Sequence, residues 1–114
     1  MAMTEVSFTR NISPDVRRFQ LATDSNSRAH QINIPPWCRR VTIIPEGKRV
    51  RLSFVTDSDD IHSDHVKLAS NAPSEIEIID GEGQGNRVDK MYIANLSVNT
   101  GTFVSVLVEG RTSK

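Results

Sequence analysis

Apolar and polar residues alternate with a period of two along most of this chain. The pattern is clearest near the C-terminus, where valines occupy every second position from Val104 to Val108 within the run Thr102–Glu109. The preceding run, Lys90–Val98, alternates in the same way, and Asn99-Thr100-Gly101 separates the two. Two alternating runs with β-branched residues around a short break that contains Gly predict an antiparallel hairpin.

A second pair of runs, Arg40–Ile44 and Lys48–Val55, flanks the turn-forming sequence Pro45-Glu46-Gly47 and predicts another hairpin. We expect the first of these strands to stop at Pro45, because proline cannot donate a hydrogen bond to a sheet. The side chains expected to face the core are Val41, Ile43, Val50, Leu52 and Phe54.

Shorter alternating runs predict the other strands, at Glu5–Ile12, Val16–Thr23, Ala29–Ile34, His65–Leu68 and Glu75–Ile79. Apolar residues nowhere recur at the three- and four-residue spacing of a helix. We therefore expect an all-β fold, an antiparallel β-sandwich of jelly-roll-like form with eight or nine short strands. The chain of 114 residues has the length of one domain. Residues 1–12 form an N-terminal arm or first strand, and residues 13–114 form the sandwich.

Composition narrows the class of protein. A domain of this size buries roughly two-thirds of the surface of its unfolded chain, so it needs no metal or disulfide to fold. Cys38 is the single cysteine, which excludes an internal disulfide. No apolar run is long enough to cross a membrane, and Met1–Arg10 does not resemble a signal peptide. We expect synthesis in the cytoplasm of a host cell.

Charge is balanced but unevenly distributed. Nine Lys and Arg and four Asp and Glu precede Ser53, whereas five Lys and Arg and ten Asp and Glu lie from Ser53 onward. One interpretation is a particle with a basic side and an acidic side, able to meet copies of itself or a charged partner. The other is that basic and acidic strands lie side by side and cancel across a sheet.

The densest group of possible metal ligands is His62, Asp64 and His65, with Asp57, Asp59 and Asp60 just upstream. An EF-hand loop would need a Gly at its sixth position and a closing Glu. A cupin would need two histidines separated by one residue, whereas two residues separate His62 and His65. In a strand that spacing directs the two side chains to opposite faces. We expect a solvated acidic loop at Thr56–Asp64, and no metal or other cofactor.

Other candidate sites are weaker. Gly81, Gly83 and Gly85 lie in the expected loop Asp80–Asn86, but no helix follows to complete a phosphate site. Neighbouring arginines could lower the pKa of the Cys38 thiol, yet no histidine is adjacent in sequence. No serine has the G-x-S-x-G context of a hydrolase. We expect no enzymatic activity.

Two arginine pairs form a candidate basic surface: Arg17, Arg18, Arg39 and Arg40. Such side chains could contact phosphates. Sheet proteins that bind nucleic acid also carry stacking aromatic residues, and this chain has one Trp and one Tyr. We expect no nucleic-acid partner. A carbohydrate-binding β-sandwich module is an alternative of another class, and it would have to build its exposed aromatic platform from Trp37 and Tyr92.

The last half of the chain resembles the small β-sandwich virion proteins of tailed bacteriophages. The resemblance lies in Tyr92-Ile93-Ala94-Asn95-Leu96, the polar turn Asn99-Thr100-Gly101-Thr102, and the closing strand Phe103-Val104-Ser105-Val106-Leu107-Val108-Glu109-Gly110. The earlier runs Ile43-Ile44-Pro45 and Val50-Arg51-Leu52-Ser53-Phe54 are also similar to theirs.

This resemblance implies a structural protein of the virion. The expected function is that of a capsid cement or decoration protein, which binds and stabilises the head shell as a homo-oligomer, often a trimer. Its partners would be the major capsid protein and copies of itself. A neck, tail or fibre-attachment adaptor is the alternative within the virion. The expected partner-binding strand is the arm, through Val6, Phe8, Arg10 and Ile12.

Overall fold

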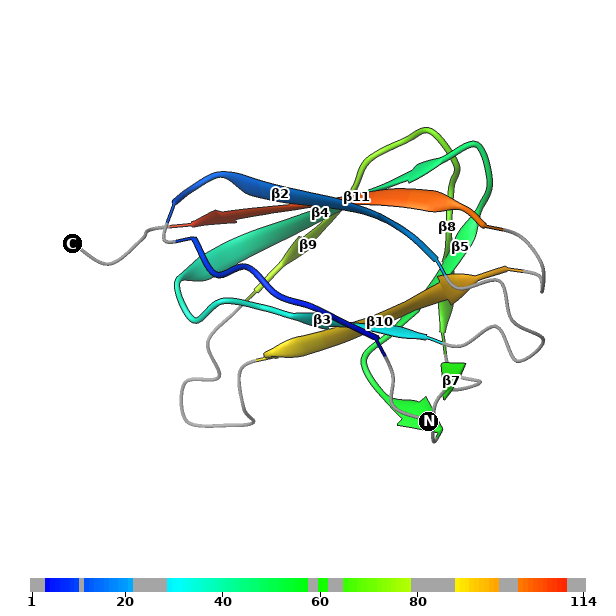
Figure 1. The fold of residues 1–114 in the computed structure, drawn as a ribbon, viewed down its shortest axis with the longest axis horizontal. Helices are drawn as coiled ribbons and strands as arrows, with labels where there is room; N and C mark the ends of the chain where they lie inside the picture. Colours follow the sequence, from blue (N-terminus) through cyan, green and yellow to red (C-terminus); the bar gives the residue numbers. More distant parts are fainter. Residues whose placement is uncertain are drawn as a thin grey trace.

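The computed structural model describes residues 4–10, 12–21, 29–57, 60–61, 65–78, 88–96 and 101–110. Within these residues the chain forms strands and no helix, and Figure 1 shows two layers of strands facing each other. One sheet, in spatial order, comprises β1 (Thr4–Val6), β3 (His30–Asn33), β10 (Lys90–Asn95), β5 (Val50–Ser53) and β8 (Val66–Leu68). We call it the five-stranded sheet.

The facing four-stranded sheet has the order β2 (Asp15–Gln20), β11 (Phe103–Gly110), β4 (Cys38–Glu46) and β9 (Ser74–Glu77). A separate small ladder pairs β6 (Thr56–Asp57) with β7 (Asp60–Ile61), within the segment expected to be only a loop.

The main strands pair in a nested order. β5 pairs with β8, β4 with β9, β3 with β10 and β2 with β11, and each pair is antiparallel. Successive pairs lie alternately in the two sheets, as if one long hairpin had been rolled around a common core. This topology is a jelly roll. The expected fold class, an antiparallel β-sandwich of jelly-roll form, is confirmed.

Both hairpins expected from the sequence are wrong. β10 and β11 lie in different sheets, and so do β4 and β5. Alternation with a period of two reports only which side chains face a core, and both sheets of a sandwich face the same core. The three residues 47–49 between β4 and β5 can span about 10 Å, which is roughly the distance between packed sheets. A short connection therefore crosses between the sheets here.

The core lies between the sheets and is filled by side chains from both. Val41, Ile43, Val50 and Leu52 are buried as expected. The expectation for Phe54 is wrong, because β5 ends at Ser53 and the Phe54 side chain is 46% exposed. The other large buried apolar residues are Val6, Leu21, Ile32, Ile34, Leu68, Ile78, Met91, Ile93, Val104, Val106 and Val108.

Pro45 does not end its strand, since β4 continues to Glu46. The carbonyl oxygen of Pro45 accepts a hydrogen bond from the amide of Asn71 at 2.7 Å, on the side of β4 that faces β9. The nitrogen and the carbonyl of one residue point to the same side of an antiparallel strand. The Pro45 nitrogen therefore points past the last β4–β9 pair, Ile43 with Ser74, where no ladder bond is lost.

The N-terminal segment is built into the sandwich. β1 pairs in parallel with β3, and Val6 belongs to the core with 4% of its side chain exposed. Phe8 packs partly against the same core. Arg10 donates a hydrogen bond to the buried carboxylate of Asp15. Residues 4–10 are thus a first strand and its extension in this chain's own sheet.

Candidate interaction surface

The outer face of the four-stranded sheet carries charge pairs at its two ends and uncharged residues between them. Register places Val16 of β2 beside Leu107 of β11, and Leu107 beside Thr42 of β4. Val16 is 48% exposed, whereas Leu107 is half-buried and Thr42 is buried. The strand period of two brings these side chains to the face opposite the core.

Arg18 and Glu46 form the charge pair at one end of this face. The guanidinium donates to both carboxylate oxygens, at 2.7 Å and 2.9 Å, which is the two-point geometry that arginine favours. Arg18 also lies over the ring of Phe103, 4.2 Å from its centroid. The hydrogen bond from Arg18 lowers the pKa of Glu46, and the bond to Glu46 raises the pKa of Arg18.

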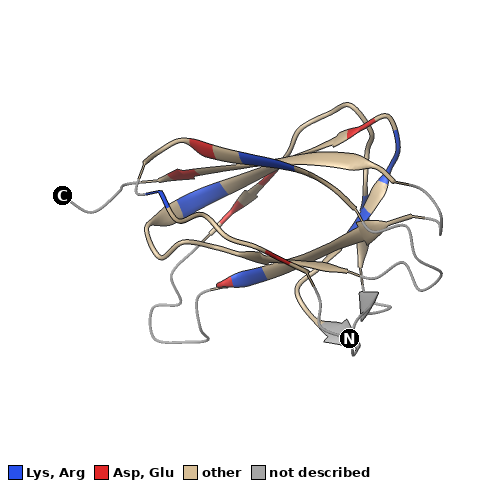
Figure 2. Ribbon diagram, viewed as in Figure 1, with Lys and Arg blue, Asp and Glu red and all other residues tan. Residues whose placement is uncertain are grey.

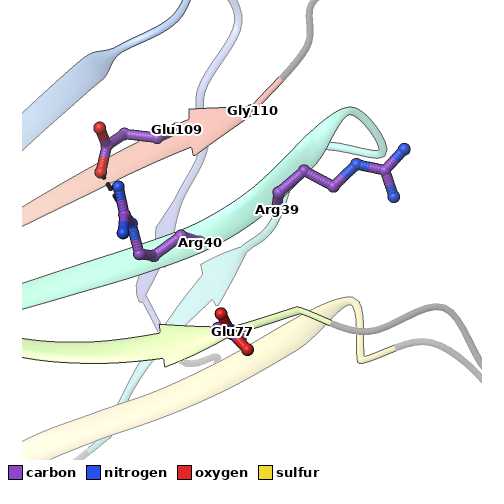
Figure 3. Close-up of a pocket in the computed structure, with 5 residues that line it drawn as sticks. All are labelled: Arg39, Arg40, Glu77, Glu109 and Gly110. Atoms are coloured by element: carbon purple, nitrogen blue, oxygen red, sulfur yellow. Dashed lines mark hydrogen bonds and ion pairs between the residues drawn. The ribbon is translucent and has the colours of Figure 1, made fainter.

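Arg40 forms the charge cluster at the other end. Its guanidinium donates to Glu109 at 3.2 Å and lies 3.8 Å from a carboxylate oxygen of Glu75. The hydrogen bond to Glu109 raises the pKa of Arg40 above its ordinary value, with further contributions from the charges of Glu109 and Glu75. An open depression of about 280 Å³ lies here, lined by Arg39, Arg40, Glu77, Glu109 and Gly110 (Figure 3).

A β-bulge directs Arg39 and Arg40 apart. Glu109 lies opposite Arg40 and Gly110 opposite Cys38, so that Arg39 is an extra residue in β4. Figure 3 shows Arg40 turned toward Glu109 and Arg39 extending away from it. A Cβ on Gly110 would lie 2.2 Å from the carbonyl oxygen of Trp37, so only glycine fits beside the bulge.

The four arginines of the expected basic surface do not gather. Arg18 lies opposite Ser105 and Arg40 opposite Glu109, four residues apart along β11, which is about 13 Å. Arg18 and Arg40 are paired with carboxylates, and Arg17 donates to the carbonyl oxygen of Ser7 at 2.6 Å. On this face Arg18 and Arg40 are neutralised by carboxylates of other strands. This agrees with the interpretation that basic and acidic strands lie side by side and cancel across a sheet.

The four residues expected to bind a partner through the arm have different environments. Val6 is buried and Phe8 is half-buried against the core, whereas Ile12 is 47% exposed. Arg10 is exposed but bonded to Asp15. Of the two apolar side chains toward the end of the arm, Ile12 is the more accessible one.

The sequence did not predict an exposed apolar corner at the end of β5 and the start of β8. Phe54, Val55 and Val66 are 46%, 50% and 56% exposed. A shallow depression of about 340 Å³ at this corner is lined by Leu52, Ser53, Phe54, His65 and Val66. We call it the apolar corner. Its signal in the sequence is the unbroken apolar pair Phe54-Val55, which departs from strict alternation.

Candidate chemical groups do not converge in the described part of the chain. Cys38 is buried in the core, and its thiol donates to the carbonyl oxygen of Arg40 at 3.3 Å. Among the described residues no three His, Cys, Asp or Glu side chains form a group that could hold a metal. His65 is half-buried at the apolar corner. The remaining candidates lie outside the described residues or have undescribed side chains: Asp57, Asp59, Asp60, His62, Asp64, Gly81, Gly83 and Gly85.

The two aromatic residues considered for a carbohydrate platform are both half-buried. Trp37 packs against the main core, and Tyr92 packs against Ala29 and Ala94. A stacking platform requires aromatic faces open to the ligand, so these positions do not favour one.

The described residues form no helix of the length and apolar character that a membrane span requires. No protein-family model, curated protein or solved structure matches this chain. The topology therefore defines the class of the protein as a jelly-roll β-sandwich, and what it does has to be argued from its surface.

Proposed function

We propose that this chain is a structural protein of a tailed-phage virion, a cement or decoration protein that binds the major capsid protein of the head shell and stabilises it. The jelly roll supports this by analogy, because capsid domains are among the proteins that use it. The resemblance of the strand from Phe103 to Gly110 to virion proteins points the same way.

The observation that carries the proposal is the distribution of apolar side chains. Those between the sheets are packed together, with Val41, Val106 and Ile93 fully buried. The exposed ones include the three neighbouring residues of the apolar corner. A protein that works by surface contact needs such a patch. The apolar corner is therefore the surface we expect to face the shell.

Copy number in purified virions tests the class of function. Quantitative mass spectrometry against the major capsid protein should find this chain at hundreds of copies per particle. About a dozen copies or fewer would instead indicate a neck, tail or fibre-attachment adaptor, and absence from the virion would overturn both.

A binding assay tests the surface. Shells that lack this protein are mixed with the wild type, with Phe54→Asp and with Ile12→Asp, and bound protein is measured after sedimentation. The two substituted side chains are equally exposed in the wild type, at 46% and 47%. We expect Phe54→Asp to weaken binding at least tenfold and Ile12→Asp to leave it unchanged. The opposite result would assign the contact to the N-terminal arm instead. Thermal melting of both variants verifies that they are folded.

A further inference from the structure

The four edge strands of the sandwich are arranged on two opposite sides. The five-stranded sheet ends in β1 on one side and β8 on the other, and the four-stranded sheet ends in β2 and β9. Only residues 69–73 separate β8 from β9, so these two edges lie together. Arg17 of β2 donates a hydrogen bond to the carbonyl oxygen of Ser7, just after β1, so the edge strands β1 and β2 also lie near each other. We call these the β8–β9 side and the β1–β2 side.

Within each sheet, the two edge strands expose charges of opposite sign. In the four-stranded sheet, β9 exposes Glu75 and Glu77, and β2 exposes Arg17 and Arg18. Figure 2 shows red on β9, and on β2 a blue stretch that follows a red one at the start of the strand, where the buried Asp15 lies. In the five-stranded sheet the signs are reversed, since β8 exposes Lys67 and β1 exposes Glu5.

Strand direction is also compatible on both sides. β2 is antiparallel to β11, β11 to β4, and β4 to β9, so β2 and β9 run in opposite directions. β1 is parallel to β3, which is linked to β8 through three antiparallel steps. A second copy placed beside the first, with its strands running in the same directions, would therefore bring β9 against β2 and β8 against β1 as antiparallel pairs.

We infer that copies of this chain associate head to tail, with the β8–β9 side of one copy against the β1–β2 side of the next. In the described part of the chain these four strands end their sheets, and the outward main-chain groups of an edge strand are suited to such addition. Val16 on β2, 48% exposed, would lose exposed area in the contact. The charges select the partner edge more than they add affinity.

The same charges disfavour a two-fold dimer. Two β9 edges would set Glu75 and Glu77 against their own copies, and two β2 edges would do the same with Arg17 and Arg18. Head-to-tail contacts close into a ring when the rotation between copies allows it. Because the two sides are opposite each other, two copies cannot satisfy both contacts, and the smallest closed ring has three copies.

The test is the mass of the purified full chain by sedimentation velocity at about 0.15 M ionic strength, where the screening length is about 8 Å. We expect three or more times the chain mass of 12.7 kDa. Two double variants reverse one edge each: Glu75→Arg with Glu77→Arg, and Arg17→Glu with Arg18→Glu. Each alone should associate at least tenfold more weakly than the wild type.

An equimolar mixture of the two double variants should assemble again. In an assembly where the two variants alternate, which needs an even number of copies, every β9 edge of one variant lies against a β2 edge of opposite charge on the other. Lys90→Glu is the matched control, since it reverses an exposed charge on β10, the middle strand of the five-stranded sheet, and should keep the wild-type mass.

A monomeric or dimeric wild type, or double variants that keep the wild-type mass, would overturn the inference. Arg18 also pairs with Glu46, so Lys67→Glu on β8 is a second way to weaken the same contact without touching that pair. This inference does not depend on the proposed function. A ring that fails to bind shells would contradict only the shell-binding proposal, and a monomer that binds shells would contradict only the ring.

Discussion

At the scale of single residues, two contacts fix the opposite ends of the four-stranded sheet: the packing of Gly110 against the backbone of β4, and the charge pair of Arg18 and Glu46. Gly110 lies against the backbone of Trp37 and Arg39, and its amide donates to the hydroxyl of Ser13 at 2.9 Å. The charge pair of Arg18 and Glu46 lies at the opposite end of the same sheet. The first contact is steric and the second electrostatic, so they respond to different tests.

We expect Gly110→Ala to destabilise the fold by about 2 kcal/mol or more, because its Cβ would meet backbone atoms that can move only with the strand. Gly47→Ala is the matched control. No atom lies within 4 Å of a Cβ there, so only the positive φ of 86° is strained, at a cost of about 1 kcal/mol. Urea unfolding measures both variants. Equal losses of stability would mean that the backbone beside Gly110 can yield.

Glu46 gives a prediction for acid pH. Its pKa is lowered in the folded chain, below the value of about 4.3 expected when unfolded. Its contribution to stability is therefore fully present above that unfolded value and is lost as pH falls through the folded pKa. Titration of the Glu46 carboxyl carbon by NMR should give a midpoint in the wild type below that in Arg18→Gln, which removes the largest cause of the lowered pKa and keeps the smaller one, the hydrogen bond from Ser105.

Arg17→Gln is the control for this titration, because Arg17 bonds to a carbonyl oxygen and not to Glu46. It should leave the Glu46 midpoint where the wild type has it. A Glu46 midpoint that does not move in Arg18→Gln would show that the pair does not persist in solution.

At the scale of elements, the N-terminal strand is the one whose role changes most between sequence and structure. As a free arm, β1 would be dispensable for folding. As the outermost strand of the five-stranded sheet, β1 buries Val6 in the core and pairs with His30, Gln31 and Ile32 of β3. Stability therefore depends on it.

Val6→Ala measures this dependence. Removing two buried carbon groups should cost about 1.5 kcal/mol, at about 0.8 kcal/mol each. Val88→Ala, at a site 38% exposed, should change stability by less than about 0.5 kcal/mol. Chemical unfolding of the two variants gives the comparison. An unchanged stability for Val6→Ala would mean that β1 is detached from the sheet in solution.

At the scale of the whole molecule, the two sheets share one core, and neither can bury its apolar face alone. From β1 to β5 and from β8 to β11, strands that follow one another along the chain lie in opposite sheets. The connections between β3 and β4 and between β4 and β5 therefore link the two layers. Trp37 lies on the first of these connections, half-buried against the core.

We therefore expect one cooperative unfolding transition. Fluorescence of Trp37, which reports the connection between the sheets, and far-ultraviolet circular dichroism, which reports the strands, should give the same midpoint in guanidinium. Two separated midpoints would mean that the sheets come apart before they unfold.

The described strands were predictable because alternation is local. Each of the nine expected strands overlaps an observed one, and Val41, Ile43, Val50 and Leu52 are buried as their parity indicates. Phe54 fails the same rule because its strand ends one residue earlier. The arginines were visible as candidates, but their carboxylate partners were not, since Glu46 is 28 residues from Arg18 and Glu109 is 69 residues from Arg40.

The sequence alone determined that the protein is all-β and which side chains face its core, because those properties depend on the side-chain period of a single strand. Only the tertiary structure decided which strands pair, that neighbouring strands cross between sheets, and that the two edge strands of each sheet expose opposite charges. Pairing depends on contacts between residues far apart in the chain, and a period of two is the same whichever partner a strand takes.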